Sequence, residues 1–273
     1  MTRFVIVPQW QGSPSSRAMQ LIDGAHAIAG DLPRAACTWV DVPLEAGEAV
    51  DTGIHRYSAL QRTRLATDEA LAGHAEPVLL IGGDCGIAVA GISHARSRHP
   101  DLAVVWLDAH GDLHSPESSG SGAFGGMALR AVLDGAAEPL GIGGGGVAAT
   151  RVVLAGARDC DDAELEYRDA AGVRWLDAGA LAHPEALADA VREIGAAAVY
   201  VHVDLDVLDP AEITGVTGPV PFGVSAADLV AALARVRDAA PLVGASIAGF
   251  APSSPASAID DLGTILRIVG ALA

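Results

Sequence analysis

The sequence predicts an α/β fold, a three-layer α/β/α sandwich with a central, mostly parallel sheet. Two observations support this prediction. Short, nearly continuous apolar runs rich in β-branched residues recur along the chain, and stretches with helical spacing lie between them. Strands that are buried on both faces have such runs, and helices then cover both faces of the sheet. The 273 residues, 51% of them hydrophobic, can bury the core of one large domain, and we expect a single domain over residues 1–273.

Five strands and three helices can be placed in chain order. The strands are predicted in RFVIVPQW (3–10), PVLLIGGD (77–84), LAVVWLDAH (102–110), RVVLAGARD (151–159) and AVYVHVDLDVLD (198–209). Apolar residues recur at helical spacing in 58–73, 186–196 and 225–240, and Ser225 is a suitable N-cap for the last of these helices. A loop rich in small residues, SPESSGSGAFGG (115–126), is interpreted as a binding loop.

The charge balance restricts the class of partner. The chain has 17 basic and 34 acidic residues and a formal net charge of −17. Proteins that bind nucleic acid or anionic membranes normally carry a basic patch, so we expect neither as a partner. No run of eighteen apolar residues occurs, and the N-terminal segment lacks the apolar stretch of a secretory signal, so we expect a cytoplasmic protein.

All 17 basic residues are arginines, and the chain contains no lysine. This excludes Schiff-base catalysis by a lysine and lysine anchoring of pyridoxal phosphate. Any catalysis must therefore rely on carboxylates, histidines, hydroxyls, thiols or metal ions.

Acidic residues cluster directly after two of the predicted strands. DAHGD contributes Asp108, His110 and Asp112, and DLDVLDP contributes Asp204, Asp206 and Asp209. Residues two apart in extended backbone point to the same side, and open parallel sheets bind ligands at the C-terminal ends of their strands. Converging carboxylates repel one another unless cations lie between them, and an oxygen-rich set with one imidazole suits Mn²⁺. The number of carboxylates indicates two metal ions that together activate a water. The structural alternatives are that DAHGD is a simple turn and that DLDVLDP only caps the end of a strand.

The segment IGGDCGIAVAG (81–91) reads as a buried strand that breaks into a glycine turn carrying Asp84 and Cys85. The three cysteines (Cys37, Cys85, Cys160) are too few and too dispersed for a disulfide framework. Taken alone, Cys85 is best interpreted as a small buried residue.

The motifs GGDC, DAHGD and HVDLDVLDP, in this order, resemble those of the arginase–agmatinase ureohydrolase family. That family has a histidine after GGD, then DAHxD and SxDxDxxDP, and the resemblance covers about residues 77–253. It implies two Mn²⁺ ions and a hydroxide between them that attacks a guanidinium carbon, with Asp112 as its hydrogen-bond partner and proton shuttle. One ion would be bound by Cys85, Asp108, Asp112 and Asp204, and the other by His110, Asp108, Asp204 and Asp206. Relatives commonly form trimers or hexamers, so a homo-oligomer is expected.

The resemblance also assigns residues to an amino-acid substrate. Ser119 and Ser121 match hydroxyls that contact the α-carboxylate in arginases, and Asp161 in GARDCD matches the aspartate that meets the α-ammonium group. A decarboxylated substrate would need no carboxylate site, so the partner expected is a guanidino amino acid. An ordinary flexible loop is the alternative interpretation of the serines.

Three departures from the family pattern lie at the reacting end. Cys85 replaces a metal-binding histidine, Gly125 replaces the proton-shuttle histidine, and Gly249 replaces the glutamate that binds the guanidinium. We expect the ion at Cys85 to be held more weakly, and the two glycines to open space for an extra oxygen. His114, and also His202 where the family has serine, are candidates to replace the proton shuttle, or else to support the metal ligands.

These departures favour a less basic guanidine, because losing the glutamate weakens the binding of a fully charged one. They resemble the branch of the family that acts on hydroxyarginine in D-cycloserine biosynthesis. We therefore predict hydrolysis of Nω-hydroxy-L-arginine to hydroxyurea and L-ornithine. The alternative activities are those of arginase, agmatinase and formimidoylglutamase, and the chain could also be a non-catalytic family member. The alternative for the metal is a softer ion such as Zn²⁺ or Fe²⁺ at the thiolate.

Overall fold

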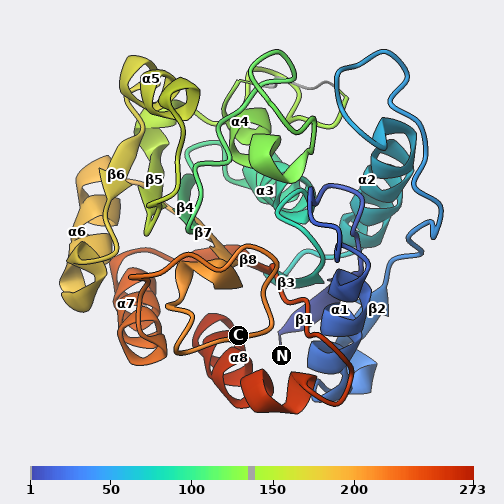
Figure 1. Ribbon diagram of the computed structural model, residues 1–273. Coiled ribbons are helices and arrows are strands. Elements are labelled where there is room, and N and C mark those ends of the chain that lie inside the picture. The colour runs from blue at the N-terminus through green and yellow to red at the C-terminus, as the bar shows by residue number, and fades with distance from the viewer. Residues whose placement is uncertain (1, 135–138) are drawn as a thin grey trace.

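The computed structural model describes residues 2–134 and 139–273, and it has the predicted three-layer arrangement (Figure 1). Within the described residues one sheet has the strand order β2-β1-β3-β8-β7-β4-β5-β6, and every pair of neighbours is parallel. Its strands are β1 (Arg3–Val7), β2 (Cys37–Trp39), β3 (Val78–Gly82), β4 (Ala103–Leu107), β5 (Val152–Ala155), β6 (Arg174–Leu176), β7 (Val199–Asp204) and β8 (Leu242–Ala248).

Helices cover both faces of this sheet. The helices are α1 (Gln20–Gly30), α2 (Tyr57–Ala72), α3 (Ile87–Arg98), α4 (Ala128–Leu133), α5 (Asp162–Ala171), α6 (Glu185–Ile194), α7 (Ala226–Ala239) and α8 (Ala258–Leu272). One face packs against α1, α6, α7 and α8, and the other against α2 to α5. In β4, Val105 and Leu107 join the first core while Val104 and Trp106 join the second. Both faces are apolar, and this accounts for the unbroken apolar runs in the sequence.

The five predicted strands and three predicted helices are confirmed, with strand ends that lie a few residues inside the predicted ranges. Ser225 caps α7 by accepting a hydrogen bond of 3.1 Å from the Asp228 backbone N–H. The sequence reading did not place β8, although β8 lies between β3 and β7 in the middle of the sheet. Small residues weaken its apolar pattern. One of them is Gly244, where a Cβ would lie only 2.9 Å from the Tyr200 ring.

The strand order brings the predicted motifs together. Strands β3, β8, β7 and β4 are consecutive in the sheet, and GGDC and DAHGD follow the first and the last of them. Leu107 pairs with Val203, and Asp204 pairs with Ala248, so Asp108, Asp204 and Gly249 lie side by side at one end of the sheet. No helix in the described part of the chain is long and apolar enough to cross a membrane.

Candidate active site

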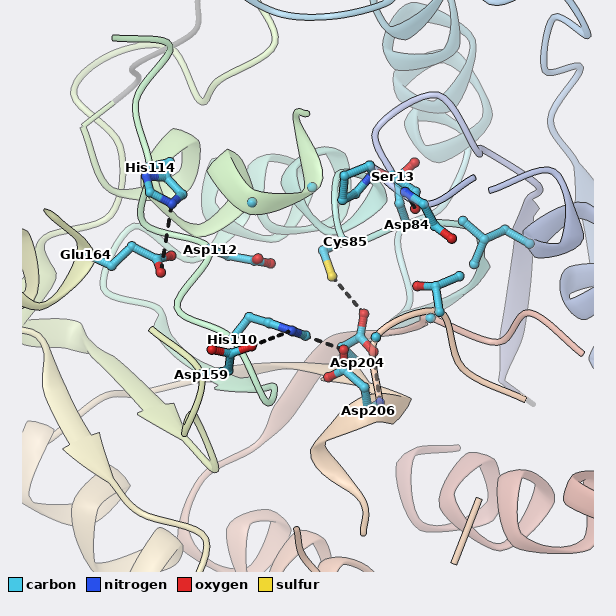
Figure 2. A pocket seen from close by; sticks show the side chains of 18 residues that line it. Ser13, Asp84, Cys85, His110, Asp112, His114, Asp159, Glu164, Asp204 and Asp206 are labelled. Carbon is cyan, nitrogen blue, oxygen red and sulfur yellow. Dashed lines mark hydrogen bonds and ion pairs between the residues drawn. The ribbon is translucent and has the colours of Figure 1, made fainter. Parts of the chain in front are cut away.

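A cavity of about 340 Å³ lies at the C-terminal ends of these strands (Figure 2). Five of the predicted metal ligands are in its wall: Cys85, His110, Asp112, Asp204 and Asp206. The sixth, Asp108, is buried behind them and contacts Cys85 and His110. The volume lies within the range of small-molecule sites, near its lower end, which suits a small amino acid.

Asp108, His110 and Asp206 form one of three groups in the described structure that could hold a metal ion; the others are Cys85 with Asp108 and His202, and His114 with Asp161 and Glu164. His110 Nδ1 lies 3.3 Å from Asp108 Oδ1 and 3.1 Å from Asp206 Oδ2. The other oxygen of Asp206 accepts a 3.0 Å hydrogen bond from the Ala109 N–H, so backbone contacts orient the carboxylate. Burial opposes a charged His110, but its hydrogen bonds with the two aspartates outweigh burial and raise its pKa. The carboxylates thus attract a positive charge at this position, and two carboxylates with one imidazole are a donor set that fits Mn²⁺.

Cys85, Asp108 and Asp204 meet on the other side of Asp108. The Cys85 thiol donates to Asp204 Oδ2 at 2.9 Å and lies 3.6 Å from Asp108 Oδ2. Burial, followed by the charges of Asp204 and Asp112, raises the pKa of Cys85, and burial raises the pKa of Asp204 to about 7. A thiolate is therefore unfavourable here without a cation, whereas a bound metal ion would deprotonate the thiol outright.

Asp112 is the strongest sign that the site fits a cation. Its backbone has a φ of +53°, which is uncommon for a non-glycine residue and is held by a 2.9 Å hydrogen bond from the Arg130 N–H to its carbonyl. Its carboxylate is buried, and Oδ2 has no hydrogen-bond partner among the described residues. Burial, and then the charge of Asp108, raises the pKa of Asp112 well above its usual range. A buried oxygen left unpaired beside other carboxylates is explained by a metal ligand role.

The predicted amino-acid end of the site is built around His114, Asp161 and Glu164. His114 and Glu164 both line the cavity, and His114 Nε2 lies 3.9 Å from Glu164 Oε2 (Figure 2). His114 Nε2 also lies 3.4 Å from Asp161 Oδ2, although Asp161 is not in the cavity wall. Asp161 is also the N-cap of α5, in a capping box with Glu164. The buried Glu164 was not among the predicted site residues, and its only sequence signal, the DDAE spacing, indicates a helix start.

Ser119 and Ser121 are placed near each other but are not in the cavity wall. Their Oγ atoms are 3.4 Å apart, and each accepts a backbone hydrogen bond within the loop, from Gly122 at 3.0 Å and Ala123 at 3.2 Å. The structure thus brings the serines together on the predicted binding loop and leaves them outside the cavity lining.

Both Gly125 and Gly249 lie in the cavity wall, and the room for a Cβ differs between them. At Gly249 the φ is +86°, and a Cβ would lie 2.2 Å from Asp204 Oδ1, so the carboxylate of Asp204 fills the place of a side chain. At Gly125 a Cβ would lie 3.0 Å from the carbonyl oxygen of Gly12. A glutamate at position 249 would displace a metal ligand from its present position.

Two further residues hold the motif backbones in place. Buried Asp84 accepts hydrogen bonds from Gln9, Gly12 and Gly86 at 2.8–2.9 Å, which fixes the turn that carries Cys85. The Arg158 guanidinium donates to backbone carbonyls that include those of Asp206 at 2.9 Å and Val220 at 2.7 Å. Both residues orient ligands without reaching the cluster themselves.

The chain matches the arginase family model over residues 16–263 and belongs to that family. It is an enzyme of the amidinohydrolase class. It is similar to Nω-hydroxy-L-arginine amidinohydrolase from Streptomyces lavendulae, with 31% identity over 95% of this chain and 93% of that protein. It shares the fold of arginase from Entamoeba histolytica (TM-score 0.87, 19% identity, 99% of this chain and 97% of that one). The arginase from Bacillus caldovelox is also similar in fold (TM-score 0.82, 23% identity, 100% and 98% covered).

Proposed function

We propose that this protein hydrolyses a guanidine C–N bond of Nω-hydroxy-L-arginine, giving hydroxyurea and L-ornithine. The observation that carries the substrate choice is position 249, where the Asp204 carboxylate occupies the space of a side chain. No acidic side chain can approach the guanidine from this position, so a charged guanidinium is bound less well than its less basic N-hydroxy form. The likeness to the Streptomyces lavendulae enzyme over nearly the whole chain supports the same choice.

We propose two Mn²⁺ ions as cofactors. Asp108, His110, Asp204 and Asp206 would bind one, and Cys85, Asp108, Asp112 and Asp204 the other. When bound, such ions supply a water acidified enough to react near neutral pH. Sulfur is a poor donor for Mn²⁺, so the ion at Cys85 would be lost first. Cys85→His should raise Mn²⁺ retention in dialysed protein, and unchanged occupancy would argue against ligation by this residue.

Asp112 would accept and then transfer the proton of the attacking water. Its unpartnered Oδ2 is buried at the cavity wall, so it is placed to hydrogen-bond to that water. We propose that it accepts this proton and then passes it to the departing amine of ornithine. His114 lies at the other end of the cavity, with Asp161, and there it is suited to assist proton exchange with solvent.

The amino-acid end would bind the substrate backbone. Asp161 would pair with the α-ammonium group. The Ser119 and Ser121 oxygens accept backbone hydrogen bonds and the two hydroxyls hydrogen-bond to each other, so one of the two hydroxyl hydrogens remains free to donate to an α-carboxylate. These assignments favour an amino acid over its decarboxylated amine.

A substrate panel tests the proposal. Purified protein with added Mn²⁺ is supplied with arginine, hydroxyarginine, agmatine or formimidoylglutamate, and urea, hydroxyurea and ornithine are measured. Of the four substrates, only hydroxyarginine is expected to give hydroxyurea, and it should give ornithine in equal amount. Ready urea release from arginine without hydroxyurea from hydroxyarginine would overturn the substrate choice. Absence of bound Mn²⁺ even in excess metal would favour a non-catalytic member of the family.

A cytoplasmic location, a trimer or hexamer, and a role in D-cycloserine biosynthesis are proposals that rest on the sequence and its resemblance. The oligomer is checked by light scattering of the purified protein.

A further inference from the structure

We propose that His202 Nε2 is a direct ligand of the ion at Cys85, which makes this half of the centre the first to exchange its Mn²⁺ for a borderline-soft divalent ion such as Zn²⁺ or Co²⁺. The inference rests on the proposed metal-dependent function and deepens it, because it assigns a ligand and an ion class to one half of the centre.

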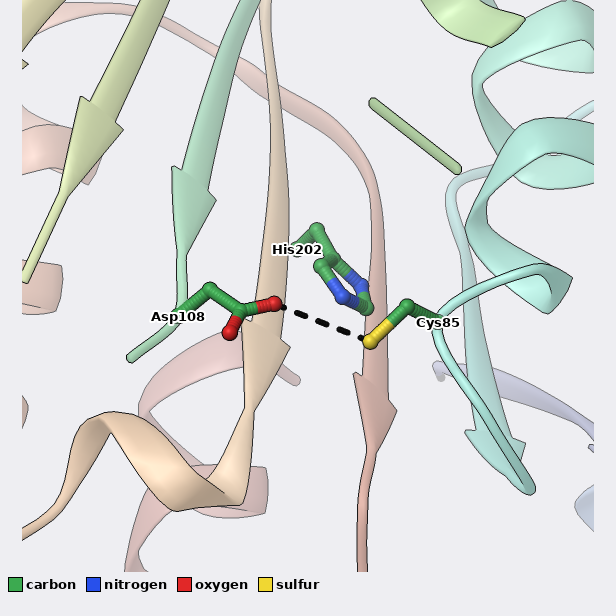
Figure 3. A group of neighbouring side chains, drawn as sticks. All are labelled: Cys85, Asp108 and His202. Atoms are coloured by element: carbon green, nitrogen blue, oxygen red, sulfur yellow. Dashed lines mark hydrogen bonds between the residues drawn. The ribbon is translucent and has the colours of Figure 1, made fainter. Parts of the chain in front are cut away.

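Three donor atoms converge at this point (Figure 3). Cys85 Sγ, a carboxylate oxygen of Asp108 and a ring nitrogen of His202 all lie within 4.8 Å of one another, and all three residues are buried. They come from the turn after β3, the end of β4 and the interior of β7. A sulfur, an oxygen and an imidazole nitrogen at this spacing can bind one ion.

The His202 ring presents an unpartnered nitrogen. Its Nδ1 lies 2.8 Å from Ser246 Oγ, while Nε2 has no hydrogen-bond partner in the described structure although the residue is fully buried. A ring that donates from Nδ1 to Ser246 carries a free lone pair on Nε2. Metal-binding histidines have this arrangement, in which a hydrogen bond on one nitrogen fixes the other toward the metal. A purely structural histidine would instead leave a buried polar atom unsatisfied, which destabilises the folded state.

The sheet register holds the ring in this orientation. His202 pairs with Trp106 on β4 and with Ser246 on β8, so both neighbours are set by strand pairing. The Trp106 and His202 ring centroids are 4.0 Å apart, and Trp106 Nε1 donates to Asp108 Oδ2 at 3.2 Å. The same tryptophan thus positions two of the three donors.

The donor set determines the ion class. Thiolate and imidazole together favour Zn²⁺ and Co²⁺, whereas the cluster of Asp108, His110 and Asp206 is dominated by oxygen and favours Mn²⁺. Binding at Cys85 requires the thiol proton to leave for solvent, so one proton is released for each ion bound. The half of the centre at Cys85 should therefore be the first to exchange Mn²⁺ for these ions.

Titration of the metal-free protein with Co²⁺ tests this assignment without substrate. The wild type should develop a sulfur-to-cobalt charge-transfer absorption, and Cys85→Ser should abolish it. His202→Asn keeps a donor near Ser246 but removes Nε2, so we expect Co²⁺ affinity at the absorbing site to fall at least about tenfold. His110→Asn is the matched control: it removes an imidazole from the other cluster and should leave the charge-transfer absorption in place. When Zn²⁺ is added to the dimanganese protein, metal analysis should show one Mn²⁺ per chain replaced first, and His202→Asn should need about tenfold more Zn²⁺ for that replacement.

Unchanged Co²⁺ affinity and absorption in His202→Asn would overturn the inference, as would the same Zn²⁺ dependence of Mn²⁺ replacement in the wild type and in His202→Asn. If His202→Asn does not fold, Ser246→Ala replaces it, because that variant keeps the ring and loses only its orienting partner. An affinity loss of about tenfold is expected for Ser246→Ala, and no loss would contradict the proposal. Because the readout is metal absorption, failure here is distinguishable from a failure to release hydroxyurea.

Discussion

The two ends of the cavity differ in how completely their polar atoms are paired. At the amino-acid end, Asp161 and Glu164 form a capping box, and His114 contacts both of them. At the reacting end, Asp112 Oδ2 and His202 Nε2 lack partners among the described residues. The described side chains pair with one another at the first end, whereas the second leaves buried polar atoms that a bound cation would contact. Substitutions at the reacting end should therefore act through metal binding and turnover, and those at the amino-acid end through substrate affinity.

The largest effect is expected from Asp108→Asn. Asp108 belongs to two of the three groups that could hold a metal ion, so its loss should weaken both ions by at least about 100-fold and remove measurable hydrolysis. Metal analysis after dialysis, together with an ornithine assay, checks this. Retention of both ions would show that Asp108 is not shared between the clusters.

Asp112→Asn should lower the rate of catalysis and leave the ion bound by His110 in place. An amide cannot accept the proton of the attacking water, so kcat should fall by about 10²–10⁴-fold. The ion bound by the cluster of Asp108, His110 and Asp206 should remain. A variant with near-normal kcat would exclude Asp112 as the proton shuttle.

Gly249→Ala tests the packing of the reacting end. The new Cβ would meet the Asp204 carboxylate at a positive φ, so we expect the free energy of unfolding to fall by about 1–3 kcal/mol, with weaker metal binding. Chemical denaturation with and without metal measures this. Gly263→Ala is the control, because a Cβ at that position in α8 meets no atom within 4 Å, and the helix should gain up to about 1 kcal/mol. Equal stability of the two variants would contradict the observed contact.

The smallest effect is expected from Asp161→Asn at the amino-acid end. Asparagine caps a helix about as well as aspartate, so α5 should persist while the negative charge is lost. We expect KM for hydroxyarginine to rise about tenfold, which is about 1.4 kcal/mol, with little change in kcat. A fall in kcat at unchanged KM would move Asp161 to the reacting end and remove the contrast between the two ends.

The strand motifs were predictable because they lie in local sequence. Apolar runs on β3, β4 and β7 identify buried strands, and the acidic residues that follow them are at strand ends by sequence order alone. Glu164 was missed because its spacing from Asp161 is that of a helix cap, and its approach to His114 depends on where α5 packs. The packing around Gly249 could not be predicted, because a glycine in the sequence does not tell which neighbour lies where a side chain would be.

The amino-acid sequence by itself determined the layered α/β fold and the acidic, lysine-free composition. It also indicated that one site contains Asp108, His110, Asp112, Asp204 and Asp206. Periodicity and short motifs report these properties because they depend on residues close together in the chain. Only the tertiary structure decided which donors surround Cys85. That choice depends on the pairing of β7 with β4 and β8, which brings His202 between Trp106 and Ser246 from segments about 40 to 100 residues away. Strand register, and not local sequence, therefore sets the chemical character of the second half of the metal centre.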